Sequence, residues 1–137
     1  MKNNILAVVL VAGLTGLTNQ TSAQNLIQNG GFETGDASGW TATGNSWDIQ
    51  SVAVGQFGTY YESEPGDGTL TQAFATTTGQ SYNLDFYAAQ DFNGNQCAII
   101  TVGINGSTID TITSQTTTFD LYSANFTATG STTTLSL

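Results

Sequence analysis

Carboxylates are the side chains of this 137-residue chain that could act as general acids or bases, because it has ten Asp and Glu residues, no His, and Lys2 as its single basic residue. A Ser-His-Asp or Cys-His arrangement and a His zinc site are therefore excluded. Glu62, Glu64 and Asp67 lie close in sequence, and a glycan-cleaving pair needs two carboxyl groups about 5–10 Å apart. We expect instead a solvated acidic loop around Pro65, and hence no enzyme; a carboxylate-based glycan-cleaving enzyme is the alternative.

Aromatic side chains outside the apolar alternation indicate a second chemistry, the stacking of rings on sugars. Such a site needs aromatic faces for pyranose rings and Asp, Asn or Gln side chains for hydroxyls. Tyr60 and Tyr61 are adjacent, so in a strand they point to opposite faces, and Tyr87 has the parity opposite to that of Phe86. The candidate carbohydrate-binding residues are Trp47, Tyr60, Tyr61, Tyr87, Asp91, Phe92, Asn93, Asn95 and Gln96. In the alternative interpretation Tyr87 lies on a second covered face and Phe92 caps the edge of the core.

The near-absence of basic side chains limits the partners of this chain. Nucleic acids and anionic lipid surfaces are bound by Lys and Arg, so both are excluded as partners. The carboxylates must be solvated, hydrogen-bonded to donors, or neutralised by a metal ion such as Ca²⁺. We therefore expect neutral polysaccharides or glycans, divalent cations and like subunits as partners.

The first 23 residues are typical of a signal peptide. Lys2 precedes an apolar stretch from Ile5 to Leu17, which is shorter than the roughly 20 residues that span a bilayer comfortably. The small residues that end at Ala23 suit signal peptidase. We expect cleavage after Ala23, no membrane insertion after cleavage, and a secreted, extracellular domain over residues 24–137, at a bacterial cell surface or matrix.

Residues 24–137 predict an all-β domain, because apolar residues alternate with polar ones in several segments and turn residues separate them. Asn105-Gly106 is the preferred pair for a two-residue hairpin turn. Residues 119–128 carry aromatics on both parities, which predicts either two covered faces or a bulge. Cys97 lies in an apolar run and cannot form an intramolecular disulfide, so we expect it to be buried. The predicted fold is an antiparallel β-sandwich without long helices.

The start of this domain resembles a known family. Its segments N-G-G-F-E at residues 29–33 and G-D-A-S-G-W at 35–40 are similar to the opening of galactose-binding-like jelly rolls, and more narrowly of carbohydrate-binding modules of the family 4 and 9 type. T-T-G-Q-S-Y at residues 77–82 and the strand that ends near Gly130 agree with the same family. The resemblance implies a jelly roll in which Trp40 packs in the core. It also implies a further strand carrying an aspartate, which is not found before Leu137, so the domain is expected to lack that strand or to complete its sheet with another chain. We therefore expect a non-catalytic carbohydrate-binding domain, and the alternative function is a structural or adhesive surface or matrix protein that assembles through its sheet edges.

A structural Ca²⁺ ion is a further expectation. Glu33 follows Phe32 in a Gly-rich bend, where exposed carbonyl groups could join a carboxylate around a hard cation. The resemblance implies such an ion at this bend, held by the residue matching Glu33 and by the aspartate of the further strand. Asp36 is the candidate substitute for that aspartate. In the alternative interpretation Glu33 accepts backbone N–H groups and fixes the loop.

Overall fold

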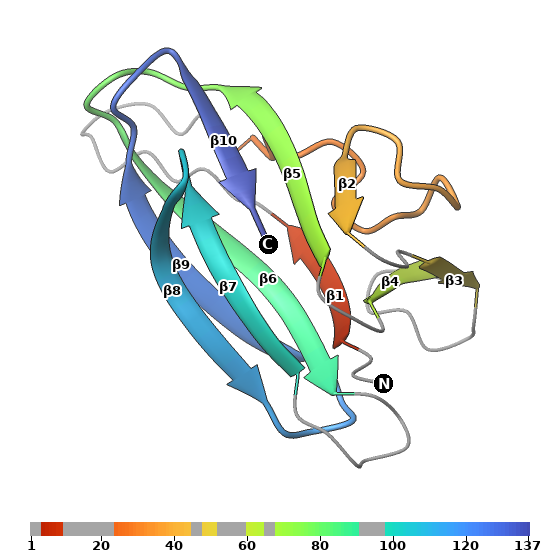
Figure 1. The fold of residues 1–137 in the computed structure, drawn as a ribbon. Coiled ribbons are helices and arrows are strands. Elements are labelled where there is room, and N and C mark those ends of the chain that lie inside the picture. The colour runs from red at the N-terminus through yellow and green to blue at the C-terminus, as the bar shows by residue number, and fades with distance from the viewer. Residues whose placement is uncertain (1–3, 10–23, 45–47, 52–59, 65–67, 91–97) are drawn as a thin grey trace.

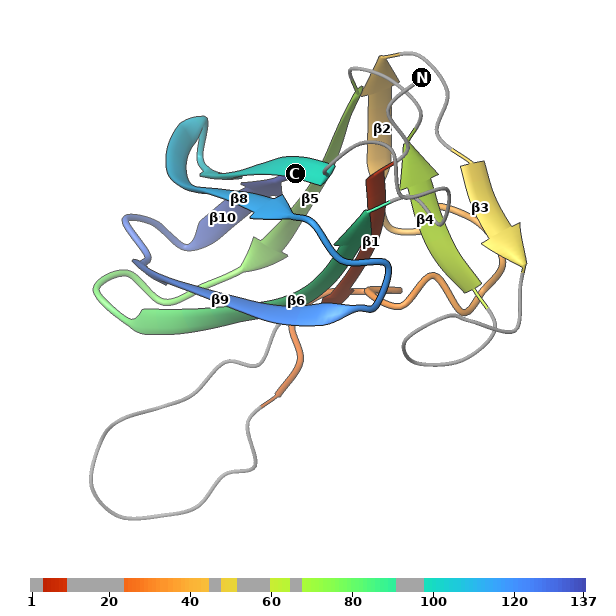
Figure 2. The ribbon, with the colours of Figure 1, turned by 90° about the horizontal axis from the view of Figure 1, so that it is seen from below.

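The computed structural model describes residues 4–9, 24–44, 48–51, 60–64, 68–90 and 98–137. All regular elements in these ranges are strands, and no helix there is long and apolar enough to cross a membrane. Two five-stranded sheets face each other, with every strand pair antiparallel (Figures 1 and 2). The predicted all-β antiparallel sandwich is confirmed.

Sheet A has the strand order β3-β4-β1-β6-β9 and sheet B the order β2-β5-β10-β7-β8. The strands of sheet A are β1 (Asn4–Val9), β3 (Asp48–Ser51), β4 (Tyr60–Glu64), β6 (Ser81–Gln90) and β9 (Asp120–Thr127). The strands of sheet B are β2 (Thr41–Gly44), β5 (Gly68–Ala75), β7 (Ala98–Ile104), β8 (Ser107–Ser114) and β10 (Thr132–Ser136). Neighbours in each sheet are therefore mostly distant in sequence.

The core between the sheets follows the alternation read from the sequence. In β6, Tyr82, Leu84 and Phe86 are buried, and the rings of Tyr82 and Phe86 pack on residues of β9. Tyr82 stacks on Phe126 with ring centroids 5.4 Å apart, and Phe86 stacks on Tyr122 at 5.8 Å. This apolar interior supplies most of the driving force for folding, since no disulfide is available.

The predicted hairpin at Asn105-Gly106 is confirmed. These two residues join β7 to β8 and have φ angles of 51° and 81°. Two successive positive φ angles are what a two-residue type I′ turn requires, and Asn and Gly adopt them at least cost. The register then shifts between Val102 and Gly103, where β7 and β8 form a bulge.

The two alternatives for residues 119–128 are also decided. β6 and β9 pair without a shift from Ser81↔Thr127 to Ala88↔Asp120, so no bulge interrupts them. The aromatics of both parities are nevertheless covered: Phe126 is buried in the core, and Phe119, which directly precedes β9, packs against the fully buried Ala89. The outer face of β9 itself is exposed at Leu121, Ser123 and Asn125.

The segment of residues 24–40 is not a regular strand, yet it is fixed to sheet B by a side chain. The amide of Gln72 in β5 accepts from the N–H of Gln28 at 2.7 Å and donates to its carbonyl at 2.9 Å. It thereby provides both hydrogen bonds that a neighbouring strand would provide. Gly39 lies close to this pair with φ of 87°, and a Cβ there would be 3.2 Å from the Cβ of Gln28.

Candidate functional site

The outer face of sheet A carries a row of polar side chains around one tyrosine. Because side chains alternate along a strand, Asn83, Asp85 and Tyr87 project away from the core that Leu84 and Phe86 enter, and all three are half-buried. Tyr87 therefore lies where its parity predicts, on the opposite side from the core set. We call this surface, with the β9 residues described next, the β6–β9 face.

The neighbouring strand β9 adds three exposed side chains to this face. The register pairs Asn83 with Asn125, Asp85 with Ser123, and Tyr87 with Leu121. Leu121 is 55% exposed, so its aliphatic side chain is accessible on this surface. The β6–β9 face thus consists of Asn83, Asp85, Tyr87, Leu121, Ser123 and Asn125.

Hydrogen bonds orient the polar half of the face. The Oδ1 atom of Asp85 accepts from the Nδ2 of Asn83 at 2.7 Å and from the Oγ of Ser123. One carboxylate oxygen is therefore held by the protein itself, in a fixed direction. Amide, carboxylate and hydroxyl groups lie beside an aromatic ring and an exposed aliphatic side chain, the combination that recognises sugar hydroxyls and the apolar face of a pyranose.

The other predicted sugar-binding residues are placed less completely. Tyr60 and Tyr61 lie in β4, within sheet A and one strand beyond β1. Leu6 of β1 is registered with both Glu62 and Ala88, and Tyr61 and Tyr87 directly precede these two residues in their strands. The remaining predicted residues, Trp47, Asp91, Phe92, Asn93, Asn95 and Gln96, lie outside the described residues.

Sequence reasoning found Tyr87 but missed its neighbours. Asn83 and Asp85 share the parity of Tyr87, so the period of two that identified the tyrosine also applied to them. Ser123 and Asn125 had no such signal, because their place beside β6 depends on the strand order.

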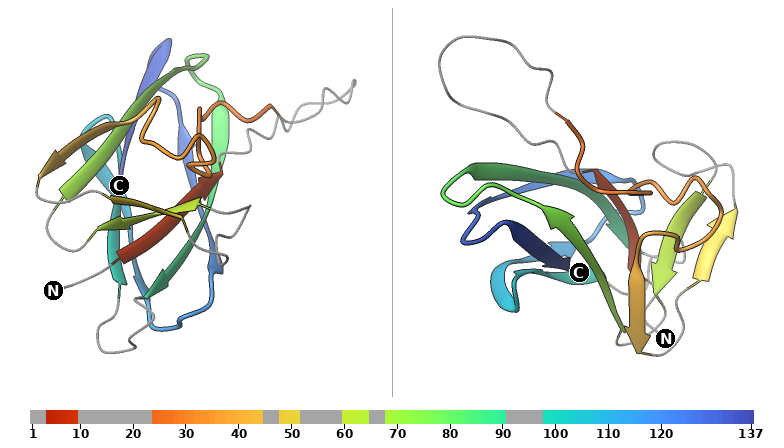
Figure 3. Two further views of the ribbon diagram at one scale, coloured as in Figure 1. Left: turned by 90° about the vertical axis from the view of Figure 1, so that its right-hand side faces the viewer. Right: turned by 90° about the horizontal axis from the view of Figure 1, so that it is seen from above.

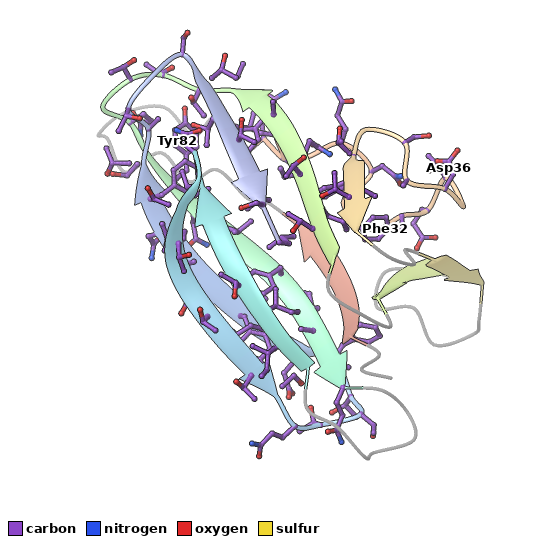
Figure 4. All side chains as sticks on the ribbon, in the orientation of Figure 1. Phe32, Asp36 and Tyr82 are labelled. Atoms are coloured by element: carbon purple, nitrogen blue, oxygen red, sulfur yellow. The ribbon has the colours of Figure 1, made fainter. Side chains whose placement is uncertain are left out.

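The loop of residues 29–40 contains the two predicted metal ligands. Both Glu33 and Asp36 are exposed, and Figure 4 shows Asp36 on the loop beside β2, far from Tyr82 at the opposite end of the sandwich. The Oδ1 of Asp36 accepts from the Oγ1 of Thr34 at 2.7 Å, from the N–H of Ser38 at 3.0 Å and from the Ser38 hydroxyl. This carboxylate is therefore already surrounded by donors.

Further hydrogen bonds close the same loop. The side chain of Asn29 donates to the carbonyls of Asp36 at 2.9 Å and Ser38 at 3.1 Å, and the indole N–H of Trp40 donates to the Asn29 carbonyl at 3.2 Å. The described part of the chain holds no group of three or more His, Cys, Asp or Glu residues that could bind a metal ion. Protein donors account for the shape of this loop, and its two carboxylates by themselves fall short of the six to eight oxygens of a calcium shell.

Removal of a donor should be visible in the titration of Asp36. Hydrogen bonds from Ser38 and Thr34 lower the pKa of Asp36 from its ordinary value of 3.8. The lowered pKa means that the stabilisation is complete above pH 3.8 and is lost as the pH falls through the pKa of the folded state. We expect Ser38→Ala to raise this pKa towards 3.8, measured by NMR titration of the side-chain carboxyl carbon. An unchanged pKa would show that these bonds do not stabilise the charged form.

The carboxylates of the alternative glycan-cleaving site lie only partly within the described residues. Glu62 and Glu64 belong to β4, while Asp67 lies outside the described residues.

Comparison with known protein families gives a match over most of the chain. The model of the carbohydrate binding domain CBM_4_9 matches residues 24–137. The chain belongs to this family. The CBM_4_9 match begins at Gln24, directly after the predicted cleavage position, and includes both the 29–40 loop and the β6–β9 face. A search of curated proteins gives no match.

Membership of the CBM_4_9 family supports carbohydrate binding as the general role of residues 24–137 and agrees with the resemblance read from their opening motifs. Carbohydrate-binding domains are typically not catalytic. The expected burial of Trp40 is confirmed: its side chain is 8% exposed and packs on the fully buried Phe32, with ring centroids 5.8 Å apart.

Proposed function

We propose that this protein is a secreted, non-catalytic domain that binds neutral glycans on the β6–β9 face. The observation that carries the proposal is the outward row in which Tyr87 and Leu121 adjoin Asp85, Asn83 and Asn125. The ring and the aliphatic side chain suit the apolar face of a sugar, and the polar groups suit its hydroxyls. Family membership supports the same general role.

The charge of the chain supports neutral glycans over acidic ones. All ten carboxylates lie within residues 24–137, which contain no basic side chain to oppose them. A uronic acid polymer would be repelled by this negative field, whereas a neutral polysaccharide would not. Binding to a neutral glycan should accordingly change little between low and high salt.

A mutation in the centre of the face tests the proposal. We expect Tyr87→Ala to raise the dissociation constant for a neutral polysaccharide about tenfold, because loss of one aromatic contact removes about 0.5–1.5 kcal/mol beyond its area burial. Isothermal titration calorimetry against a panel of soluble neutral polysaccharides measures this effect. Asp85→Asn should weaken binding less, because it keeps the carbonyl oxygen as an acceptor.

The control for this test is Ile109→Ala in β8, which removes apolar surface from a 37% exposed side chain of sheet B. It should leave the affinity unchanged. Equal affinities of Tyr87→Ala and Ile109→Ala, or no binding of any polysaccharide in the panel, would contradict the proposed site.

A structural calcium ion at Glu33 and Asp36 remains a separate prediction. If the ion binds there, about 1 mM Ca²⁺ should raise the melting temperature relative to EDTA, since extracellular calcium sites are half-saturated near this concentration. Glu33→Gln should then abolish the rise. A melting curve that calcium leaves unchanged would count against the ion and leave the hydrogen bonds of the loop as its sole support.

A further inference from the structure

Strand β1 (Asn4–Val9) is a central strand of sheet A. It is registered with β6 over six pairs, from Asn4↔Gln90 to Val9↔Asp85, and with β4 over three pairs, from Asn4↔Glu64 to Leu6↔Glu62. Figure 3 shows β1 lying between these two strands. Within the described part of the chain, β1 is the element that joins β3 and β4 to the rest of sheet A.

The same strand lies inside the predicted signal peptide. Cleavage after Ala23 would remove Asn4–Val9 and leave a gap one strand wide between β4 and β6. The N–H and C=O groups of β6 that face β1 would lose their partners. Phe86 and Ala88, whose side chains are completely buried, would lie beside this gap.

We propose that, once the signal peptide is removed, the gap between β4 and β6 accepts an extended, uncharged apolar segment of another polypeptide in the place of β1. This inference concerns assembly and does not rest on glycan binding. Insertion of a strand restores the backbone hydrogen bonds on both sides, as in other cases of strand addition. It also gives a specific position to the alternative function of a surface or matrix protein that assembles through its sheets.

The chemistry of the inserted segment follows from the register. Leu6 is registered with Ala88 and Val8 with Phe86, so an incoming segment must place uncharged residues at these positions. An acidic segment would also be repelled, because residues 24–137 carry ten carboxylates and no cation. A segment of at least six uncharged residues with the pattern of Asn4–Val9 meets both conditions.

The first test uses the protein recovered after export of the 137-residue chain. N-terminal sequencing should find a start at Gln24; a chain that keeps Asn4–Val9 overturns the proposal. A synthetic peptide of residues 3–10 is then added as the probe. We expect it to raise the melting temperature by about 5 °C or more near saturation, and to slow amide hydrogen exchange of residues 85–90 at least about tenfold.

Two altered peptides serve as a matched pair. Val8→Asp places a charge beside the buried Phe86, whereas Ala7→Asp places the same charge beside the half-buried Tyr87 on the outer face. We expect Val8→Asp to abolish the protection of residues 85–90 and Ala7→Asp to retain most of it. Equal effects of the two peptides, or no protection by the unmodified peptide, would overturn the proposal.

A tethered variant keeps the test decisive if the exported chain is poorly folded without a strand inserted between β4 and β6. Residues 4–9 are attached after Leu137 through a flexible Gly/Ser linker of about 15 residues, which is long enough to span roughly 20 Å. The tethered protein should be monodisperse and cooperatively folded, and the same protein with Val8→Asp should not. Identical behaviour of the two tethered proteins contradicts a strand-accepting gap.

Discussion

Phe32→Ala should lower the free energy of unfolding by about 3–5 kcal/mol, because it removes a large, completely buried side chain and leaves a cavity beside Trp40. Phe32 is unusual in having φ of 56°, a left-handed conformation that is strained for a bulky residue. The buried ring compensates for this strain. Urea denaturation of the purified protein measures the loss.

The backbone conformation permits a sharper version of this experiment. Gly adopts positive φ without strain, so Phe32→Gly should be no more destabilising than Phe32→Ala. At Phe86, which is equally buried but lies within β6, the glycine variant should be worse than the alanine variant by about 0.5–1 kcal/mol. The same order at both positions would contradict the assigned role of the backbone at Phe32.

Gln72→Leu is expected to cost about 2–5 kcal/mol, because it leaves both backbone groups of Gln28 without their partners in a part-buried setting. The side chain of Gln72 is only 5% exposed, so water cannot easily replace it. The loss should release residues 24–31 from sheet B, which faster amide hydrogen exchange at Gln28 would report.

Gln72→Glu should make stability depend on pH. The carboxylate would replace the amide donor that faces the Gln28 carbonyl, so burial and the missing donor would raise its pKa above the ordinary value of about 4.3. A raised pKa in the folded state means that stability is full below the unfolded value and is lost as the pH rises through the folded value. Urea denaturation should therefore find this variant closer to the wild type at low pH than at neutral pH.

Gln80→Glu is the matched control for this pH experiment. The amide of Gln80 donates to the carbonyl of neighbouring Ser81 at 3.4 Å, in an exposed position. Its replacement should produce little pH-dependent change. If the stabilities of both glutamate variants show the same pH dependence, the pairing of Gln72 with Gln28 is not its cause.

The sequence by itself determined which side chains enter the core. Alternation in residues 82–88 and the turn at Asn105-Gly106 are local patterns, and a period of two fixes the two faces of a strand before its neighbours are known. The near-absence of basic residues likewise favoured neutral partners and a non-catalytic role. These properties depend on composition and short-range spacing alone.

Only the tertiary structure decided which strands lie side by side. It brought Ser123 and Asn125 next to Asp85 and Asn83 and so formed the β6–β9 face. It also paired Gln72 with a backbone segment 44 residues away, in a position that alternation would assign simply to the core. Strand order depends on the packing of the whole chain, and no local periodicity encodes it.

Residues 4–9 show most clearly how local sequence and tertiary structure contribute differently. As a sequence they are the apolar beginning of a signal peptide, while in the fold of the full chain they form a central strand of sheet A. Apolar β-formers suit both roles, because each requires uncharged residues in a short run. The sheet defines the second role, since β4 and β6 present two rows of backbone donors and acceptors that an extended segment can join.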